Sequence, residues 1–206
     1  MTRAMAFPIS RWLLPTAAIL AIAVAMAAVA PRDAVASVSI PVSFEGLLAG
    51  STDAVVATPA DARAQWENGR IYTYSHVHVD RAIAGTLTAG ADAWVRTMGG
   101  IVGGTGQRVE GEAQLVPGQQ SLLFLQPGPS GFFRVTARAQ GQFPVIPSSD
   151  QSPAYVVRSG AIGALVPRQV QPPSVPALLA ADALHGRTVD DAVQQVLSAW
   201  NRAHPR

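Results

Sequence analysis

Two histidines spaced two residues apart are the strongest candidates for chemistry in this 206-residue chain. His76 and His78 lie in a stretch where apolar and polar residues alternate, so both side chains are expected on one face of a strand. That spacing can supply two ligands of a zinc or copper site if a third ligand comes from elsewhere. Asp80 on the same face and the distant His185 are the candidates. The simpler interpretation is a polar outer strand face with no metal, and we favour it.

A glycine-rich segment from Gly99 to Gly106 suggests a phosphate-binding loop at first sight. A Walker loop ends in a lysine followed by Ser or Thr, and the chain contains no lysine. A dinucleotide-binding fingerprint needs a third glycine that opens a helix, whereas Gln107-Arg108-Val109 follows here. We therefore predict a loop that joins two strands and uses glycine for backbone conformations with positive φ.

The other catalytic patterns are also missing from the sequence. No G-x-S-x-G or H-E-x-x-H segment is present, and the absence of cysteine rules out a cysteine nucleophile. Two acid pairs remain, Glu110 with Glu112 and Asp190 with Asp191. A glycosidase pair is defined by its separation in space, and a solvated loop and a first helical turn explain these two pairs more simply. We predict no catalytic residue, no cofactor and a non-catalytic protein.

The first 36 residues predict export. Arg3 and Arg11 precede an uncharged run of 19 residues from Trp12 to Ala30, and the small-residue triplet 34–36 follows. This order is typical of a secretory signal peptide, with cleavage after Ala36 and export to the periplasm or beyond. The alternative is a retained membrane anchor, because about 20 apolar residues can span a bilayer. Arginine without any lysine, together with abundant alanine, is typical of a bacterium with a GC-rich genome.

The charge balance argues against a nucleic-acid partner. Arginine supplies all 15 basic side chains, against 13 acids. Cleavage after Ala36 would leave 12 of each, a net charge near zero, and no block of arginines is interleaved with aromatic residues. We expect that the protein can bind another exported protein and that it does not bind nucleic acid. We expect it to contact a membrane only through an uncleaved signal segment. Without cysteine, stability must come from a packed core.

The elements that must position these residues are short strands framed by helices. Ser43 is suited to cap a short helix that ends at Gly50. Tyr72 and Tyr74 share the strand face of the histidines. Two C-terminal helices are expected at 177–184 and 188–202, the second with an apolar stripe. Strands are expected at 54–57, 70–80, 93–98, 120–126, 132–137, 143–146 and 154–158.

This pattern predicts a mainly β fold, a small closed or partly open antiparallel β-barrel of OB-like type, with a short N-terminal helix and C-terminal helices. The predicted organisation is a signal peptide at 1–36, a β-barrel domain at 37–165, a proline-rich linker at 166–176 and a helical segment at 177–206.

Several motifs resemble those of a family of uncharacterised exported bacterial proteins, over roughly residues 43–145. The glycine string and the 139–143 segment are the most distinctive of them. The motifs are Ser43-Phe44-x-x-Leu47, Asp53-Ala54-Val55-Val56, Ile71-Tyr72-Thr73-Tyr74, Gly99-Gly100-x-x-Gly103-Gly104-x-Gly106, Pro117-Gly118, Leu122-Leu123-Phe124-Leu125 and Ala139-Gln140-Gly141-Gln142-Phe143. The resemblance implies an exported domain and assigns no chemistry.

The helix followed by a small barrel is also loosely similar to the OB-type barrel of the tissue inhibitors of metalloproteinases. Those inhibitors are cysteine-rich and bind the protease zinc through an N-terminal cysteine. This chain contains no cysteine, so it cannot use that mechanism. The expected function is an exported non-catalytic binding or interaction module of unidentified ligand. Two alternatives stay open: an inhibitor or accessory partner of an exported peptidase, and a metal-binding protein or enzyme using His76 and His78.

Overall fold

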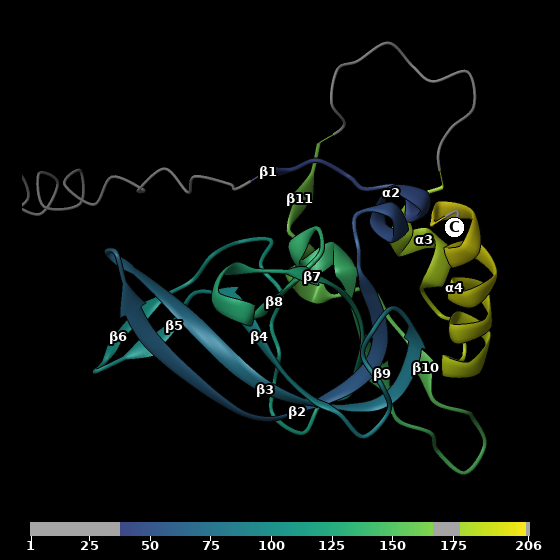
Figure 1. The fold of residues 1–206 in the computed structure, drawn as a ribbon, viewed down its shortest axis with the longest axis horizontal. Helices are drawn as coiled ribbons and strands as arrows, with labels where there is room; N and C mark the ends of the chain where they lie inside the picture. Colours follow the sequence, from purple (N-terminus) through teal and green to yellow (C-terminus); the bar gives the residue numbers. More distant parts are fainter. Residues whose placement is uncertain (1–37, 167–177, 205–206) are drawn as a thin grey trace, which may run out of the picture. The chain divides into compact units, whose positions relative to one another are not determined.

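The computed structural model describes residues 38–166 and 178–204, which belong to one compact unit (Figure 1). The predicted signal segment and nearly all of the predicted linker lie outside the described residues. The elements are, in chain order, β1 (Val38–Ser39), α2 (Phe44–Ala49), β2 (Asp53–Glu67), β3 (Arg70–Ala84), β4 (Asp92–Met98), β5 (Gly100–Val102), β6 (Thr105–Gln107), β7 (Ser121–Pro127), η1 (Pro129–Gly131), β8 (Phe133–Val135), η2 (Arg138–Gly141), β9 (Gln142–Ile146), β10 (Tyr155–Val156), η3 (Gly160–Ile162), β11 (Ala164–Leu165), α3 (Ala180–Leu184) and α4 (Val189–Ala203).

Five of these strands close into a barrel. The neighbours around it are β7, β2, β3, β4 and β8, and β7 pairs with β8 to complete the ring. All of these pairings are antiparallel except that between β4 and β8, which is parallel. Numbered along the chain, the five barrel strands follow the cyclic order 1-2-3-5-4, which is the connectivity of an OB barrel. The predicted OB-like β-barrel is therefore confirmed.

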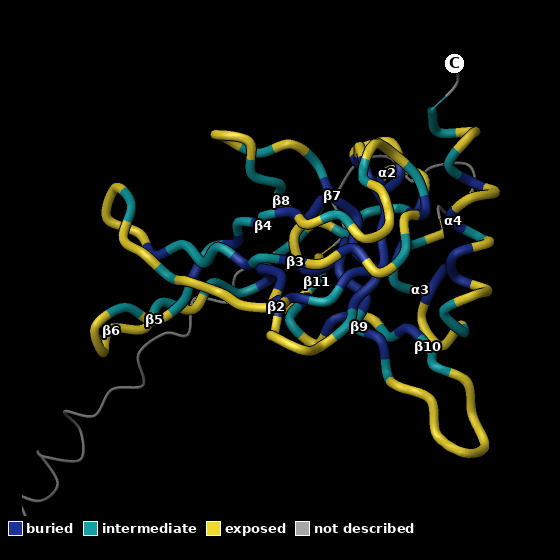
Figure 2. Tube along the Cα trace, turned by 60° about the horizontal axis from the view of Figure 1, so that its bottom comes forward, coloured by how far each residue is buried: buried dark blue, intermediate teal, exposed yellow. Residues whose placement is uncertain are grey.

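Strand β7 is buried on both faces, as its apolar sequence predicts. Leu123 and Leu125 belong to the cluster that fills the barrel interior. Leu122 and Phe124 point the other way, into a second cluster formed with the helices. The barrel therefore has two hydrophobic cores, one inside the ring and one between its outer surface and the helices. In Figure 2, the buried residues concentrate in these two places.

The helices gather on one side of the barrel, and the β5–β6 hairpin lies on the other (Figure 1). The hydroxyl of Ser43 accepts a hydrogen bond from the backbone N–H of Gly46, which caps α2 as predicted. Helix α4 packs against α2 and β3, with Val193 and Val196 buried. Leu197, also part of the predicted stripe, is 37% exposed, because Ala192 and Ala199 occupy the buried side instead.

The last described residue reaches back to the first helix. His204 Nε2 lies 3.0 Å from the backbone carbonyl oxygen of Ser51, and its ring stacks on that of Trp200 with centroids 4.1 Å apart. The beginning and the end of the described chain are thus held together.

Several elements differ from the sequence prediction. Strands β2 and β3 run 15 residues each and extend past the barrel, where the sequence predicted 54–57 and 70–80. The glycine segment is not a simple loop, because β5 and β6 pair within it as a hairpin. Strand β8 is shorter than predicted, since Ala137 and Arg138 both have positive φ and cannot continue a strand.

Gly100 shows why this hairpin requires glycine. Its φ is +136°, and a Cβ atom there would lie 2.5 Å from Thr73 Oγ1. The close approach places the hairpin directly over β3, and any larger residue would push the two apart.

Candidate functional site

The outer face of β2, β3 and β4 carries nine side chains in a regular grid. The register of the three strands pairs them directly across the sheet. The rows are Asp61–His76–Trp94, Arg63–Tyr74–Arg96 and Gln65–Tyr72–Met98. We call this set the outer grid; the residues from β3 and β4 are half-buried, and those from β2 are exposed.

Arg96 fixes the centre of the outer grid. Its Nε donates to the hydroxyl of Tyr74 at 2.9 Å, and its NH2 group lies 2.6 Å from an oxygen of Glu67. Tyr74 donates a further hydrogen bond to Glu67. This bond, helped by Gln65 and then by Arg96, lowers the pKa of Glu67 from 4.5 to about 2. Burial and the bond to Glu67 raise the pKa of Tyr74. The charged pair therefore persists at every physiological pH.

Aromatic rings surround this centre. Phe132, from the loop between β7 and β8, meets Tyr74 edge to face with centroids 4.7 Å apart. The ring of His76 lies 4.9 Å from that of Trp94, and the guanidinium of Arg63 lies 5.6 Å from the same indole. A shallow depression of about 330 Å³ opens there, lined by Arg63, Gln65, Tyr74, Trp94 and Phe132.

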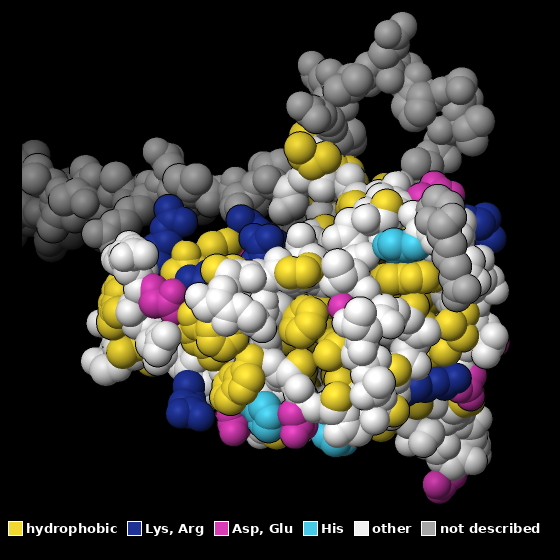
Figure 3. All heavy atoms as spheres, in the orientation of Figure 1, with side chains coloured by type: hydrophobic (Ala, Val, Ile, Leu, Met, Phe, Trp, Pro, Cys, Tyr) yellow, Lys and Arg dark blue, Asp and Glu magenta, His cyan; other side chains and the backbone are white. Residues whose placement is uncertain are grey.

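The surface shows the same mixture of side chains. In Figure 3, hydrophobic, histidine, acidic and arginine side chains gather along the lower edge, where β2 and β3 lie in Figure 1. Flat rings beside hydrogen-bonding groups form a surface that can stack on a ligand and orient it at the same time.

A second cavity lies where β4 and β8 meet, and we call it the seam cavity. It has a volume of about 440 Å³ and adjoins the outer grid, since Tyr72 and Arg96 line it. Arg134, Arg138 and Glu112 also line it. Glu112 is nearly buried, and this burial raises its pKa, although Arg138 Nε at 3.8 Å from Glu112 Oε2 opposes the effect.

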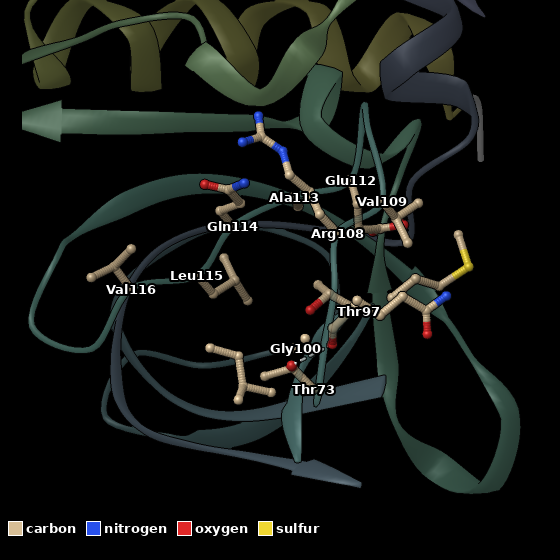
Figure 4. Close-up of a pocket in the computed structure, with 15 residues that line it drawn as sticks. Thr73, Thr97, Gly100, Arg108, Val109, Glu112, Ala113, Gln114, Leu115 and Val116 are labelled. Atoms are coloured by element: carbon tan, nitrogen blue, oxygen red, sulfur yellow. Dashed lines mark hydrogen bonds between the residues drawn. The ribbon is translucent and has the colours of Figure 1, made fainter. Parts of the chain in front are cut away.

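A third cavity, of about 550 Å³, lies at the end of the barrel beneath the β5–β6 hairpin. In Figure 4, Arg108, Glu112 and Gln114 lie on one side, and Thr73, Thr97 and Gly100 on the other. Its polar groups are largely engaged within the protein: Thr73 donates to the carbonyl of Gly99, and Arg108 pairs with Glu110.

The histidines lie where the sequence predicted, on the outer face with the two tyrosines. Their acidic neighbour is Asp92, 3.0 Å from His78 and 3.9 Å from His76. Asp80 bonds to Thr58 and Gln120 instead. His185 accepts a hydrogen bond from the backbone of Arg158, away from the pair. Within residues 38–166 and 178–204, no group of three or more His, Cys, Asp or Glu is placed to hold a metal ion.

The acid pairs separate into unrelated environments. Glu110 is bound by Arg108, whereas Glu112 faces the seam cavity. Asp190 and Asp191 occupy the first turn of α4. Oδ1 of Asp190 forms an ion pair with a guanidinium nitrogen of Arg81, 2.6 Å away. The first-turn position of Asp190 and Asp191 agrees with the prediction, whereas Glu112 is buried and does not lie in a solvated loop as predicted.

Sequence analysis placed Tyr72, Tyr74 and Trp94 on strand faces without identifying them as a site. The alternation of β3 and β4 was visible, but the register that joins three strands into the outer grid depends on tertiary pairing. No sequence pattern marks Phe132, Arg134 and Arg138 as site residues, because they lie in a loop and around the short strand β8.

Comparisons with protein-family models, with curated proteins and with solved structures gave no significant match to this chain.

Proposed function

We propose that this protein is an exported, non-catalytic binding module that takes a saccharide on its outer grid. The observation that carries the proposal is the arrangement of Tyr74, Trp94 and Phe132 around a hydrogen-bonded arginine. Aromatic faces stack on the apolar faces of sugar rings, and polar groups beside them can bond to the hydroxyls.

The position of the outer grid on the barrel supports the same function. It covers the second and third barrel strands and the adjoining part of the first, beside the loop between the fourth and fifth, which supplies Phe132. OB barrels bind oligonucleotides and oligosaccharides on this face and with these loops. A fold-level likeness is an analogy, so the site's own chemistry has to choose between the two ligand classes.

Charge favours the saccharide. A nucleic-acid strand needs a positively charged groove along its backbone. The chain after Ala36 has 12 arginines and 12 acids, and Asp61, Glu67 and Asp92 lie in or beside the outer grid. A peptide that adds a strand needs an exposed sheet edge. At the outer grid β2 pairs with β3 alone and leaves one edge open, but the aromatic side chains lie on the face of β3 and β4, so we expect the ligand to meet side chains on this face rather than the edge.

Export rests on the predicted signal peptide, with its basic start, uncharged run and small-residue triplet. In the part of the chain that the structure describes, we found no helix with the length and apolarity needed to cross a membrane.

The metal-binding alternative keeps one observation in its favour, the pair His76 and His78 beside Asp92.

The test is binding of the chain 37–206 to an array of neutral and acidic oligosaccharides, followed by titration of each hit in solution. We expect Trp94→Ala to weaken binding about tenfold, which corresponds to about 1.4 kcal/mol. Trp66→Ala is the matched control. Trp66 is exposed and pairs with the inward-facing Ile71, so it lies on the opposite face of the sheet. The proposal fails if no saccharide binds, or if both substitutions weaken binding equally.

A further inference from the structure

The seam cavity exists because β4 and β8 barely pair. Val95 and Phe133 form the one residue pair that joins these strands in the described chain. The cavity of about 440 Å³ opens beyond that pair, between Thr97 and Met98 of β4 and Val135 of β8. Of the junctions in the ring, this seam is therefore closed by the fewest paired residues, and it leaves space for a ligand group.

The lining of the seam cavity is cationic. Arg96, Arg134 and Arg138 contribute three guanidinium groups, and Glu112 is the single acid. Since the chain after Ala36 is balanced in charge, this is a local surplus. Guanidinium groups bind carboxylates and phosphates through paired hydrogen bonds.

Two of the three arginines remain available to a ligand. Arg96 is engaged by Glu67 and Tyr74. Arg134 is exposed and forms no ion pair within residues 38–166 and 178–204. Arg138 is half-exposed, and its contact with Glu112 at 3.8 Å is too long for a strong hydrogen bond.

The backbone that presents Arg138 is strained. Ala137 and Arg138 have φ of 52° and 57°, in the left-handed region that is unfavourable for residues other than glycine. The turn is closed so tightly that a Cβ atom at Gly141 would lie 2.1 Å from the carbonyl oxygen of Thr136. Strain of this kind persists where the surrounding structure enforces it, and it often accompanies a ligand site. Here it places the Arg138 side chain at the cavity.

The seam cavity and the outer grid form one continuous surface. Tyr72 and Arg96 belong to the grid and also line the cavity. A saccharide stacked on the grid can therefore extend an acidic substituent toward Arg134 and Arg138.

We propose that the seam cavity is an oxyanion subsite and that the ligand is an acidic saccharide, whose carboxylate or phosphate is bound by Arg134 and Arg138. This inference rests on the proposed saccharide-binding function and names the class of saccharide. The aromatic grid binds the ring faces, and the two arginines select for the charge.

The first experiment compares tetragalacturonate with its methyl ester, in which each carboxylate is replaced by an uncharged ester that carries an added methyl group. We expect the chain 37–206 to bind the acid at least tenfold more tightly than the ester at fixed ionic strength. The double variant Arg134→Gln, Arg138→Gln should lose that preference and keep its affinity for the ester. Arg202→Gln, on α4 outside the barrel, is the matched control and should retain the preference. Equal affinity of the unsubstituted protein for both ligands overturns the subsite and leaves the proposed function standing.

The second experiment tests the subsite without a bound saccharide chain. The side-chain Nε–H signals of Arg134 and Arg138, assigned from the single Gln variants, are followed by NMR during titration with galacturonic acid or with inorganic phosphate. Saturable shifts with galacturonic acid support the subsite even if neither tetrasaccharide binds, in which case only the proposed grid function fails. Shifts with phosphate alone would assign the cavity to the free ion and overturn the acidic saccharide, and no shift with either probe overturns the subsite.

Discussion

The guanidinium carbon of Arg96 lies 3.5 Å from the centroid of the Tyr72 ring, although Tyr72 is not its direct partner in the sheet. The register places Arg96 opposite Tyr74 and Tyr72 opposite Met98. Arg96 therefore reaches diagonally across the two strands and covers one tyrosine ring while its Nε donates to the hydroxyl of the other. Tyr74 is left free to meet Phe132 with its ring edge, and the whole centre of the grid depends on Glu67 to hold Arg96.

Substitution of Glu67 should change stability in a pH-dependent manner. The pKa of Glu67 is lowered from 4.5 to about 2, so its carboxylate stabilises the fold above pH 4.5 and loses that effect as the pH falls toward 2. We expect Glu67→Gln to unfold at a lower temperature than the unsubstituted protein at pH 7, with the difference shrinking through this window. Thermal unfolding from pH 7 to pH 2 measures it. A difference that is constant with pH would contradict the ion pair with Arg96.

Substitution of Glu112 should change stability with the opposite pH dependence. Burial raises the pKa of Glu112, so the folded protein holds this proton to a higher pH than the unfolded chain does. Wild-type stability from this group is fully present below pH 4.5 and declines as the pH rises through the raised value. We therefore expect Glu112→Gln to raise the unfolding temperature at pH 7 and to have little effect near pH 4. A variant that is less stable at pH 7 would mean that the contact with Arg138 outweighs the cost of burial.

Phe124→Ala should be strongly destabilising. The side chain is fully buried between the barrel and the helices, and its ring meets Phe143 edge to face with centroids 6.1 Å apart. Removing it leaves a cavity, and we expect a loss of about 3–5 kcal/mol in the free energy of unfolding by urea denaturation. Phe132→Ala, in the half-exposed loop, is the control and should cost about 1 kcal/mol or less. Similar losses for both would place Phe124 at the periphery.

The histidine pair should carry no stoichiometric metal. With Asp92 as its neighbour and Asp80 bound elsewhere, the pair is expected to be a polar part of the outer grid. Elemental analysis of the purified chain 37–206, after dialysis against a weak chelator, should detect neither zinc nor copper. One equivalent of either metal, lost in His76→Ala, would establish the metal-binding alternative.

The exported protein should begin at Ser37. The triplet 34–36 closes the uncharged run, which predicts cleavage after Ala36. Intact-mass measurement of the native protein decides this. A membrane-bound form that retains residues 1–36 would support the anchor instead.

Local chemistry made part of this fold predictable. Ser43 and Thr188 are good caps, and both begin helices by accepting a backbone N–H three residues on. The apolar segment at 122–125 predicts a strand that is covered on both faces, and the structure confirms it. Features of this kind depend only on residues that are close together in the sequence, so they can be predicted from it directly.

The extension of β2 could not be predicted for a physical reason. Pro59 and the polar residues after it lack the alternation that marks a half-buried strand. The structure accommodates Pro59 just beyond the last residue paired with β7, at a register shift before Asp61. Pairing with β3 alone keeps the segment extended, and only the folded sheet provides that partner.

The site was less predictable than the fold. Tyr74 and Trp94 were visible as members of strands, but Phe132 and Arg138 come from a loop and a turn. Their positions depend on the closure of β7 onto β8 and on the left-handed conformation of residues 137–138. A sequence pattern with a period of two residues contains neither relationship.

The contact of His204 with Ser51 sets the order in which the chain can be completed. The two residues are separated by 153 positions, and α2 shares its core with α4. A nascent chain emerging from the ribosome can therefore form α2 and β2 long before it contains the helix that covers them. Such long-range closure slows folding and keeps apolar surface exposed until α4 has been synthesised. Under the export that we propose, a helix so far along the chain that completes the first core would delay folding before the protein crosses a membrane.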